Sequence, residues 1–422
     1  MSDVSALEHK QSKWSMVGKD AYAMPLEDID LSHPGIWQAN EYLPFLERLR
    51  KEDPIHFCKE SAVGSYWSVM KYNDIIEVDT KPDIYSSEPS IGIVDTFYDL
   101  NLPSFIAMDR PKHDDQRRIV QPVVAPANLK NLEVLIRERV CKILASLPIK
   151  EEFDWVQLVS IELTTQMLAT LFDFPFEDRY KLTYWSDMTT AISGGGVEQS
   201  REERLAAIEE CLAYFTRLWN ERVNAKPGFD LVSMLAHGQA TRNMPPDEFL
   251  GNLILLIVGG NDTTRNSISG GVVALNENPT EYGKLRNDVS LIPNMVSEII
   301  RWQTPLAYMR RTVIQDTELG GKKIKAGDKV IMWYVSGNRD EEVIERPNDF
   351  WIDRPNARHH LSFGFGIHRC MGNRLAEMQL RILWEEIMQR FQFVEIVGEP
   401  QRVYSSFIKG YTHLPVVLHP KD

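Results

Sequence analysis

Apolar residues recur at intervals of three and four over most of the chain beyond residue 129, which is the spacing of one face of an amphipathic helix. A long helix is predicted over residues 247–276, because two prolines precede it and Asp247 and Glu248 suit a first helical turn. Another is predicted after residue 370, where apolar side chains stand at Ala376, Leu380, Leu383, Ile387 and Phe391. The pattern therefore predicts a mostly helical protein.

Strand-like segments are fewer and shorter. Alternating or β-branched residues occur at 66–69 near the N-terminus, at 329–335, and at 414–418 near the C-terminus. No internal repeat and no linker rich in glycine, serine or proline divides the chain. We therefore predict one domain over residues 1–422, mainly α with a minor β region.

Composition and charge narrow the class of protein. The 422 residues are 43% hydrophobic, which is ordinary for a globular chain, and the formal net charge is -13. Such a charge disfavours nucleic acid and anionic membranes as partners. The first twenty residues mix both charges, and the longest aliphatic run, 253–258, is far short of the about 20 residues that span a membrane. We expect a cytoplasmic protein without a membrane anchor.

Four cysteines lie far apart, and none belongs to a CxxC pair, so neither a disulfide framework nor a structural zinc site is predicted. Cys58, Cys141 and Cys211 are expected to be small buried hydrophobic residues. Cys370 differs in its neighbours, since Phe363, Gly366, Cys370 and Gly372 form the pattern FxxGxxxCxG. This cysteine is the candidate for chemistry.

The pattern suits a thiolate that faces a metal. Glycines let backbone N–H groups approach the sulfur, and the positive end of the helix after Cys370 favours the ionised form. An exposed nucleophilic cysteine would fit the same facts. That alternative is the weaker one, because no motif supplies a catalytic base beside it.

The segment FGFGIHRCMG resembles the haem-binding loop of the cytochrome P-450 superfamily, and three further matches, at 259–264, 298–301 and 347–354, precede it in the family's order. Residues 259–264, GGNDTT, resemble the motif of its distal helix. Glu298 and Arg301 resemble its ExxR pair, although the same spacing also occurs at Glu47/Arg50 and Glu399/Arg402. Only the middle copy lies between the distal-helix motif and the cysteine loop, and Arg354 in the following segment would complete a structural Glu-Arg-Arg cluster.

The resemblance runs from about residue 35 to the C-terminus, which leaves residues 1–34 as an N-terminal extension, and it implies the cytochrome P-450 fold. It also implies haem b, held by the thiolate of Cys370. The haem propionates need basic partners, for which arginine offers a bidentate fork. The cofactor-binding residues carried over by position are His113, Arg117, Arg311, Phe363, His368, Cys370 and Gly372. Arg310 adjoins Arg311, and a shift of one residue would exchange them.

By resemblance to this family, Asp262 and Thr263 are expected to take part in catalysis as a source of protons. Thiolate ligation favours cleavage of the O–O bond in a bound peroxide, which requires two protons. The hydroxyl of Thr263 and the carboxylate of Asp262 are their predicted source. The alternative is a threonine that only bonds to the carbonyl groups of its own helix. Gly259 and Gly260 argue against that alternative, since each costs about 1 kcal/mol in a helix and a local widening that admits oxygen would justify them.

The implied substrate is apolar. The motif segments are similar to those of the bacterial branch that hydroxylates alkanes and fatty acids at the terminal carbon. Steroid side-chain hydroxylases share the TTRN ending but carry glutamate where this chain has Asp262, and a steroid or terpenoid hydroxylase is the alternative. The predicted pocket residues, each of which could equally be ordinary core, are Ile91, Ile93, Val94, Leu256, Val258, Gly259, Leu306, Met309 and Phe407.

Electrons are expected from separate proteins, because the family pattern fills the chain and leaves no room for a fused reductase. The resemblance implies a ferredoxin and an NAD(P)H-dependent ferredoxin reductase, with Arg369 and Arg374 as part of a docking patch. Two other classes of function stay open. An enzyme that uses peroxide directly would often lack the Asp-Thr pair, and a haem-based gas sensor or electron carrier would give no reason for it.

Overall fold

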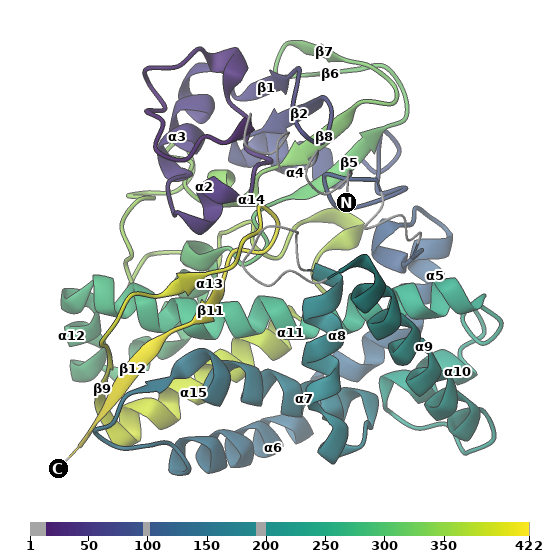
Figure 1. Ribbon diagram of the computed structural model, residues 1–422, viewed down its shortest axis with the longest axis vertical. Coiled ribbons are helices and arrows are strands. Elements are labelled where there is room, and N and C mark those ends of the chain that lie inside the picture. The colour runs from purple at the N-terminus through teal and green to yellow at the C-terminus, as the bar shows by residue number, and fades with distance from the viewer. Residues whose placement is uncertain (1–13, 96–101, 191–199, 422) are drawn as a thin grey trace.

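The computed structural model describes residues 14–95, 102–190 and 200–421. About half of these residues are helical, and the β region is small (Figure 1). In Figure 1 the long helix α11 crosses the middle of the molecule, with the largest sheet above it and α6, α7 and α15 below. The helices are α2 (Gly35–Gln38), α3 (Leu43–Glu52), α4 (Tyr72–Thr80), α5 (Lys112–Val120), α6 (Pro126–Ala145), α7 (Glu162–Phe172), α8 (Tyr180–Thr190), α9 (Arg201–Val223), α10 (Leu231–His237), α11 (Pro246–Glu277), α12 (Pro279–Asn287), α13 (Ile292–Gln303), α14 (Tyr334–Gly337) and α15 (Asn373–Arg390).

The strands form one larger and three small sheets among the described residues. The larger sheet has the order β1-β2-β8-β5-β3, in which only the β2–β8 pair is parallel. A three-stranded sheet has the order β4-β12-β9, and the pairs β10–β11 and β6–β7 complete the β region. The strands are β1 (Ile55–Cys58), β2 (Tyr66–Val69), β3 (Tyr85–Ser86), β4 (Phe153–Asp154), β5 (Met309–Val313), β6 (Thr317–Leu319), β7 (Lys322–Ile324), β8 (Lys329–Met332), β9 (Phe391–Ile396), β10 (Gln401–Arg402), β11 (Tyr411–His413) and β12 (Pro415–Pro420).

The predicted fold class is confirmed, and the predicted elements differ from the observed ones mainly at their ends. The strand expected over 329–335 stops at Met332, because the chain turns into the short helix α14. The helix expected over 247–276 begins one residue earlier and ends one later. Among the described residues no helix is both long and apolar enough to cross a bilayer.

Helix α11 is continuous through Gly259 and Gly260, so the predicted widening of the helix is wrong. Gly260 has a packing role instead. A Cβ atom there would lie 2.7 Å from Cδ2 of Leu168 on α7, whereas a Cβ at Gly259 would meet nothing within 4 Å. The first glycine therefore leaves free space beside the helix, and the second allows α7 to approach.

The cysteines follow the expectation with one exception. Cys58 and Cys211 are buried, as predicted for small hydrophobic residues. Cys141 is only half-buried, because its thiol lies 3.3 Å from a carboxylate oxygen of Glu386 and 3.3 Å from a guanidinium nitrogen of Arg390. Its surroundings are polar rather than apolar.

Candidate active site

The loop that carries Cys370 is shaped by two glycines. Gly364 and Gly366 have φ of +65° and +64°, a conformation that side-chain-bearing residues rarely adopt. A Cβ at Gly366 would also lie 2.2 Å from the carbonyl oxygen of Asp79 at the end of α4. The backbone N–H of Cys370 donates to the carbonyl oxygen of Phe363 over 2.7 Å. Gly366 is thus required by backbone conformation and by its close approach to α4.

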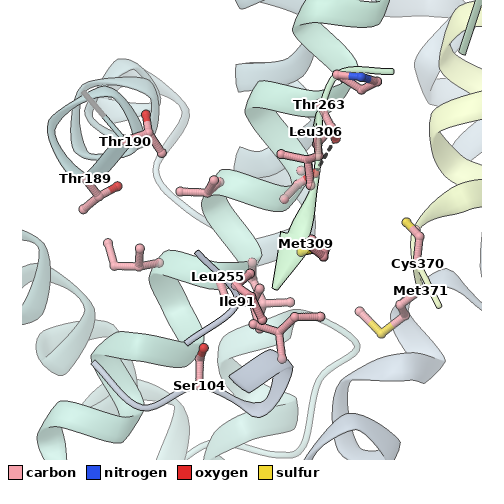
Figure 2. A pocket seen from close by; sticks show the side chains of 18 of the residues that line it. Ile91, Ser104, Thr189, Thr190, Leu255, Thr263, Leu306, Met309, Cys370 and Met371 are labelled. Atoms are coloured by element: carbon pink, nitrogen blue, oxygen red, sulfur yellow. Dashed lines mark hydrogen bonds between the residues drawn. The ribbon is translucent and has the colours of Figure 1, made fainter. Parts of the chain in front are cut away.

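Cys370 faces an internal cavity just before α15 begins at Asn373 (Figure 2). No other cysteine lines this cavity in the described part of the chain. Burial raises the pKa of the Cys370 thiol, while the backbone N–H groups of Gly372 and Asn373 and the charges of Arg117 and Arg369 lower it. The groups that were predicted to lower the pKa of this thiol are present, but the effect of burial is larger. A metal would have to complete the deprotonation, as coordination to a cation does for thiols.

Buried ion pairs join α13 to the chain segments that precede the cysteine loop. The guanidinium of Arg301 makes two bonds of 2.7 Å to the carboxylate of Glu298, and Arg354 reaches the same carboxylate at 3.0 Å. Arg301 also donates to the carbonyl oxygens of Asn338 and Pro347. The structure therefore brings together the three residues that the sequence suggested as a structural cluster, and all three are buried.

Thr263 and Asp262 lie on α11 but face different ways. Thr263 lines the cavity, and its hydroxyl donates to the carbonyl oxygen of Gly259 over 2.8 Å. The bond to its own helix, which the sequence interpretation set aside, is thus present. Asp262 is fully buried behind the cavity wall, where its carboxylate lies 2.6 Å from Arg265 and 3.3 Å from the hydroxyl of Ser186.

The pair formed by Asp262 and Arg265 extends toward the surface. Arg265 also lies 2.9 Å from the carboxylate of Asp187, whose side chain is half exposed. Burial raises the pKa of Asp262 above the ordinary value of an aspartate, and the charge of Arg265 opposes this rise. Asp262 is therefore a buried carboxyl that holds its proton to a higher pH than an ordinary aspartate. Its ion pair with Arg265, and that of Arg265 with Asp187, lead from it to the surface.

The cavity has a volume of about 410 Å³, and apolar side chains provide most of its wall. Figure 2 shows Cys370 and Met371 on one side, Thr189 and Thr190 on the opposite side, and Thr263 on α11 between them. Seven of the nine predicted pocket residues line it, namely Ile91, Leu256, Val258, Gly259, Leu306, Met309 and Phe407.

Two predicted pocket residues are not in the wall. Ile93 is buried in the N-terminal core beside Trp37, and its backbone N–H donates to the hydroxyl of Tyr308. Val94 packs against the same core. Ile91 and Asp95 both line the cavity, but the side chains of Ile93 and Val94 between them pack into this core, and an apolar pattern does not show that direction.

The sequence interpretation missed the part of the wall that α8 and α9 supply. Their apolar faces were readable, but nothing in the pattern distinguishes a face that lines a cavity from one that packs in a core. The missed residues on and near these helices and on α7 are Leu168, Leu171, Met188, Thr189, Thr190, Leu205 and Ile208.

Basic side chains gather near the cysteine. His368, Arg117 and Arg311 line the cavity, and the ring of His113 lies 4.2 Å, centroid to centroid, from that of His368. Burial lowers the pKa of both histidines, while the carboxylate of Asp114, 2.7 Å from Nδ1 of His113, acts to raise the pKa of His113. Arg311, rather than Arg310, is the arginine in the cavity wall, since Arg310 turns to Asp95.

Comparison with known proteins decides the family. The family model described as Cytochrome P450 matches residues 131–410. The chain belongs to the cytochrome P450 family. The P450 linalool 8-monooxygenase of Pseudomonas putida is 34% identical over 94% of this chain and all of its own length. A methyl-branched lipid omega-hydroxylase of Mycobacterium tuberculosis is 33% identical over 93% of this chain and 95% of its own.

The solved structures agree. A cytochrome P450-153 from Novosphingobium aromaticivorans superimposes with a TM-score of 0.86 at 46% identity, covering 92% of this chain and 99% of that one. This P450 is therefore a monooxygenase that carries haem b with a cysteine thiolate as the axial ligand. Cys370 is the cysteine that the cavity offers for it.

The residues around the cavity fit haem. Nε2 of His113 and both ring nitrogens of His368 are buried and have no hydrogen-bond partner within the described ranges. Buried ring nitrogens without partners are costly, and a haem propionate would accept a hydrogen bond from those that carry a proton. Arg117 and Arg311 would add positive charge at the same place. Cys370, the two histidines and the two arginines together would hold the group.

Proposed function

We propose that this P450 hydroxylates the terminal carbon of medium-chain alkanes or fatty acids. The observation that carries the proposal is the apolar wall of the cavity that ends at Cys370 and Thr263. An apolar chain enters such a cavity without leaving polar groups unpaired. The relative named as a methyl-branched lipid omega-hydroxylase supports a lipid chain end as the reacting position.

The protein's own groups bind and orient the chain and manage protons. Bound haem supplies the oxidising chemistry by which one atom of O₂ is inserted into a C–H bond. Thr263 has a hydroxyl at the cavity surface that can donate a hydrogen bond there once it leaves the carbonyl oxygen of Gly259. Asp262, behind it, can take up protons through the side of the helix that faces Asp187. Electrons come from a ferredoxin and its NAD(P)H-dependent reductase.

A terpenoid or steroid side-chain hydroxylase is the second candidate, and the relative named linalool 8-monooxygenase favours it. Both candidates need an apolar cavity. They differ in the shape of the molecule that fills it, since a linear chain needs a narrow channel and a branched or fused-ring substrate a wider one.

Titration of the ferric holoenzyme with substrates separates the candidates. Binding that displaces water from the iron shifts the Soret absorption band, so n-alkanes and fatty acids of graded length should shift it with an optimum at medium length. Incubation with surrogate ferredoxin and reductase should then give the terminal alcohol as the main product. Shifts with steroids or terpenoids but none with linear chains would overturn the proposal.

A further inference from the structure

A single buried carboxylate lies behind the cavity wall where the cysteine loop and the basic side chains meet. It belongs to Asp79, the second-last residue of α4, whose side chain is 1% exposed. Figure 1 shows α4 beside the sheet that contains β5 and β8. Asp79 itself does not line the cavity, and it acts on the cavity only through its neighbours.

Three segments of the chain converge on this carboxylate. One oxygen lies 2.7 Å from Nη2 of Arg311 on β5. The other accepts the hydroxyl of Tyr334 over 2.9 Å and the backbone N–H of Phe365 over 2.8 Å. Arg311 and Tyr334 line the cavity, and Phe365 lies in the cysteine loop. The carboxylate thus ties a cavity-facing cation to the backbone that precedes Cys370.

The backbone of Asp79 reinforces the same link. Its carbonyl oxygen occupies the space that a side chain on Gly366 would need, and its carboxylate lies 3.3 Å from where a Cβ of Gly364 would stand. Both glycines of the loop therefore pack against this one residue. A displacement of Asp79 would move the guanidinium of Arg311 and the loop together.

We infer that Asp79 is a positioning residue that fixes the guanidinium of Arg311 to the cysteine loop and sets the charge balance beside the haem. Two of the three bonds on the carboxylate come from neutral donors, so its negative charge offsets the charge of Arg311. In a site of low dielectric, charges that are fixed in this way act strongly on a redox centre. A negative charge opposes the uptake of an electron, and a positive charge favours it.

The test is the reduction potential of the substrate-free ferric holoenzyme, measured by spectroelectrochemical titration. Asp79→Asn keeps the shape and an acceptor oxygen but removes the charge, so the potential should rise. We expect about a tenfold change in the ferrous-to-ferric ratio at a fixed applied potential, which is about 59 mV for a one-electron couple. Arg311→Gln should lower the potential, and the double variant should return toward the wild-type value.

Asp340→Asn is the matched control. Asp340 is also buried, but its carboxylate accepts the backbone N–H groups of Tyr72, at the start of α4, and of Glu342, rather than one from the cysteine loop. This control should change the potential by far less than Asp79→Asn, even where it lowers stability. Transfer of haem to apomyoglobin should be faster for Asp79→Asn than for wild type, and Asp79→Glu should restore slow transfer.

Opposite shifts from the two single variants distinguish charge balance from a damaged fold. Both variants moving the potential in one direction, or Asp79→Asn leaving it unchanged, would overturn the inference. An equal shift in Asp340→Asn would do the same. Tyr334→Phe, which keeps the charge of Asp79 and removes one donor to it, provides an independent variant if Asp79→Asn loses haem. Its potential should fall, and a rise or no change would contradict the assignment.

Discussion

On the cysteine side of the cavity, the backbone is held by buried ion pairs and by Gly364 and Gly366, whose φ angles are positive. Each of these contacts depends on the identity of one residue. On the opposite side, α8, α9 and the middle of α11 present mostly apolar side chains, and the polar ones include Thr189, Thr190, Arg204 and Thr263. Glu298 and its two arginines have no freedom to change partners, because any unpaired charge there would be buried. The polar contacts of the first side hold one backbone geometry, whereas the cavity wall on the second side is formed mainly by apolar packing.

The largest effect is expected on the cysteine side, from Glu298→Gln. The variant would leave Arg301 and Arg354 buried without a countercharge, which costs about 3–5 kcal/mol. Denaturant unfolding of the holoenzyme measures this loss. Glu377→Gln is the control, since its partner Arg358 is exposed and such a pair contributes about 0–1 kcal/mol. Equal losses of unfolding free energy in the two variants would contradict the greater importance of the buried ion pairs.

A smaller effect, on chemistry rather than stability, is expected from Thr263→Ala on the opposite side. Haem content and substrate-induced spectral shifts should stay as in the wild type. Product formed per NADH should fall roughly tenfold, with a matching rise in hydrogen peroxide, because a proton donor at the cavity surface is lost. Thr263→Ser keeps the hydroxyl and should restore most of the yield. Unchanged yield in the alanine variant would rule out the hydroxyl as a donor.

Asp262 should make the stability of the protein depend on pH. Burial raises its pKa in the folded state above the value of about 4 in the unfolded chain. Its contribution to stability is therefore complete below pH 4 and is lost as the pH rises through the folded-state pKa. The wild type, compared with Asp262→Asn, should lose about 2 kcal/mol of relative stability between pH 4 and pH 8. Unfolding at several pH values measures the difference, and a constant difference would contradict the raised pKa.

The smallest effect is expected from Gly259→Ala. The new methyl group enters open space and improves helix propensity, so stability should rise by up to about 1 kcal/mol. The same group narrows the cavity beside Thr263, and affinity for the bulkiest substrates should fall. Gly260→Ala, which meets Leu168, should gain less stability. Thermal unfolding measures the change in stability of both variants, and Soret titration measures their substrate affinity. An equal gain in stability from Gly260→Ala and Gly259→Ala would show that α7 moves aside at no cost in free energy.

The contrast between the two sides also explains what the sequence could predict. Spacing of Phe363, Gly366 and Cys370 located the cysteine loop, because a fixed backbone geometry requires fixed residues. The choice of Arg311 over Arg310 needed the structure, since adjacent residues on a strand point to opposite faces. Ile93 and Val94 do not line the cavity, because their side chains pack in the N-terminal core.

Other features were invisible for a different reason. Asp79 lies almost 290 residues from the loop that it supports, and a lone aspartate in a helical segment carries no local signal. The glycine pair of α11 was interpreted as a site of helix widening, although the packing of Leu168 explains one glycine and open space the other. Long-range contacts of this kind leave no periodicity in a single sequence.

The close approach of Gly366 to Asp79 has a consequence for protein engineering. Libraries that randomise the cysteine loop to tune the metal will be dominated at position 366 by variants that fail sterically, whatever their electronic merit. Position 371, which lies outside the short 366–368 helix that packs against α4, is where diversity can be sampled without first displacing α4.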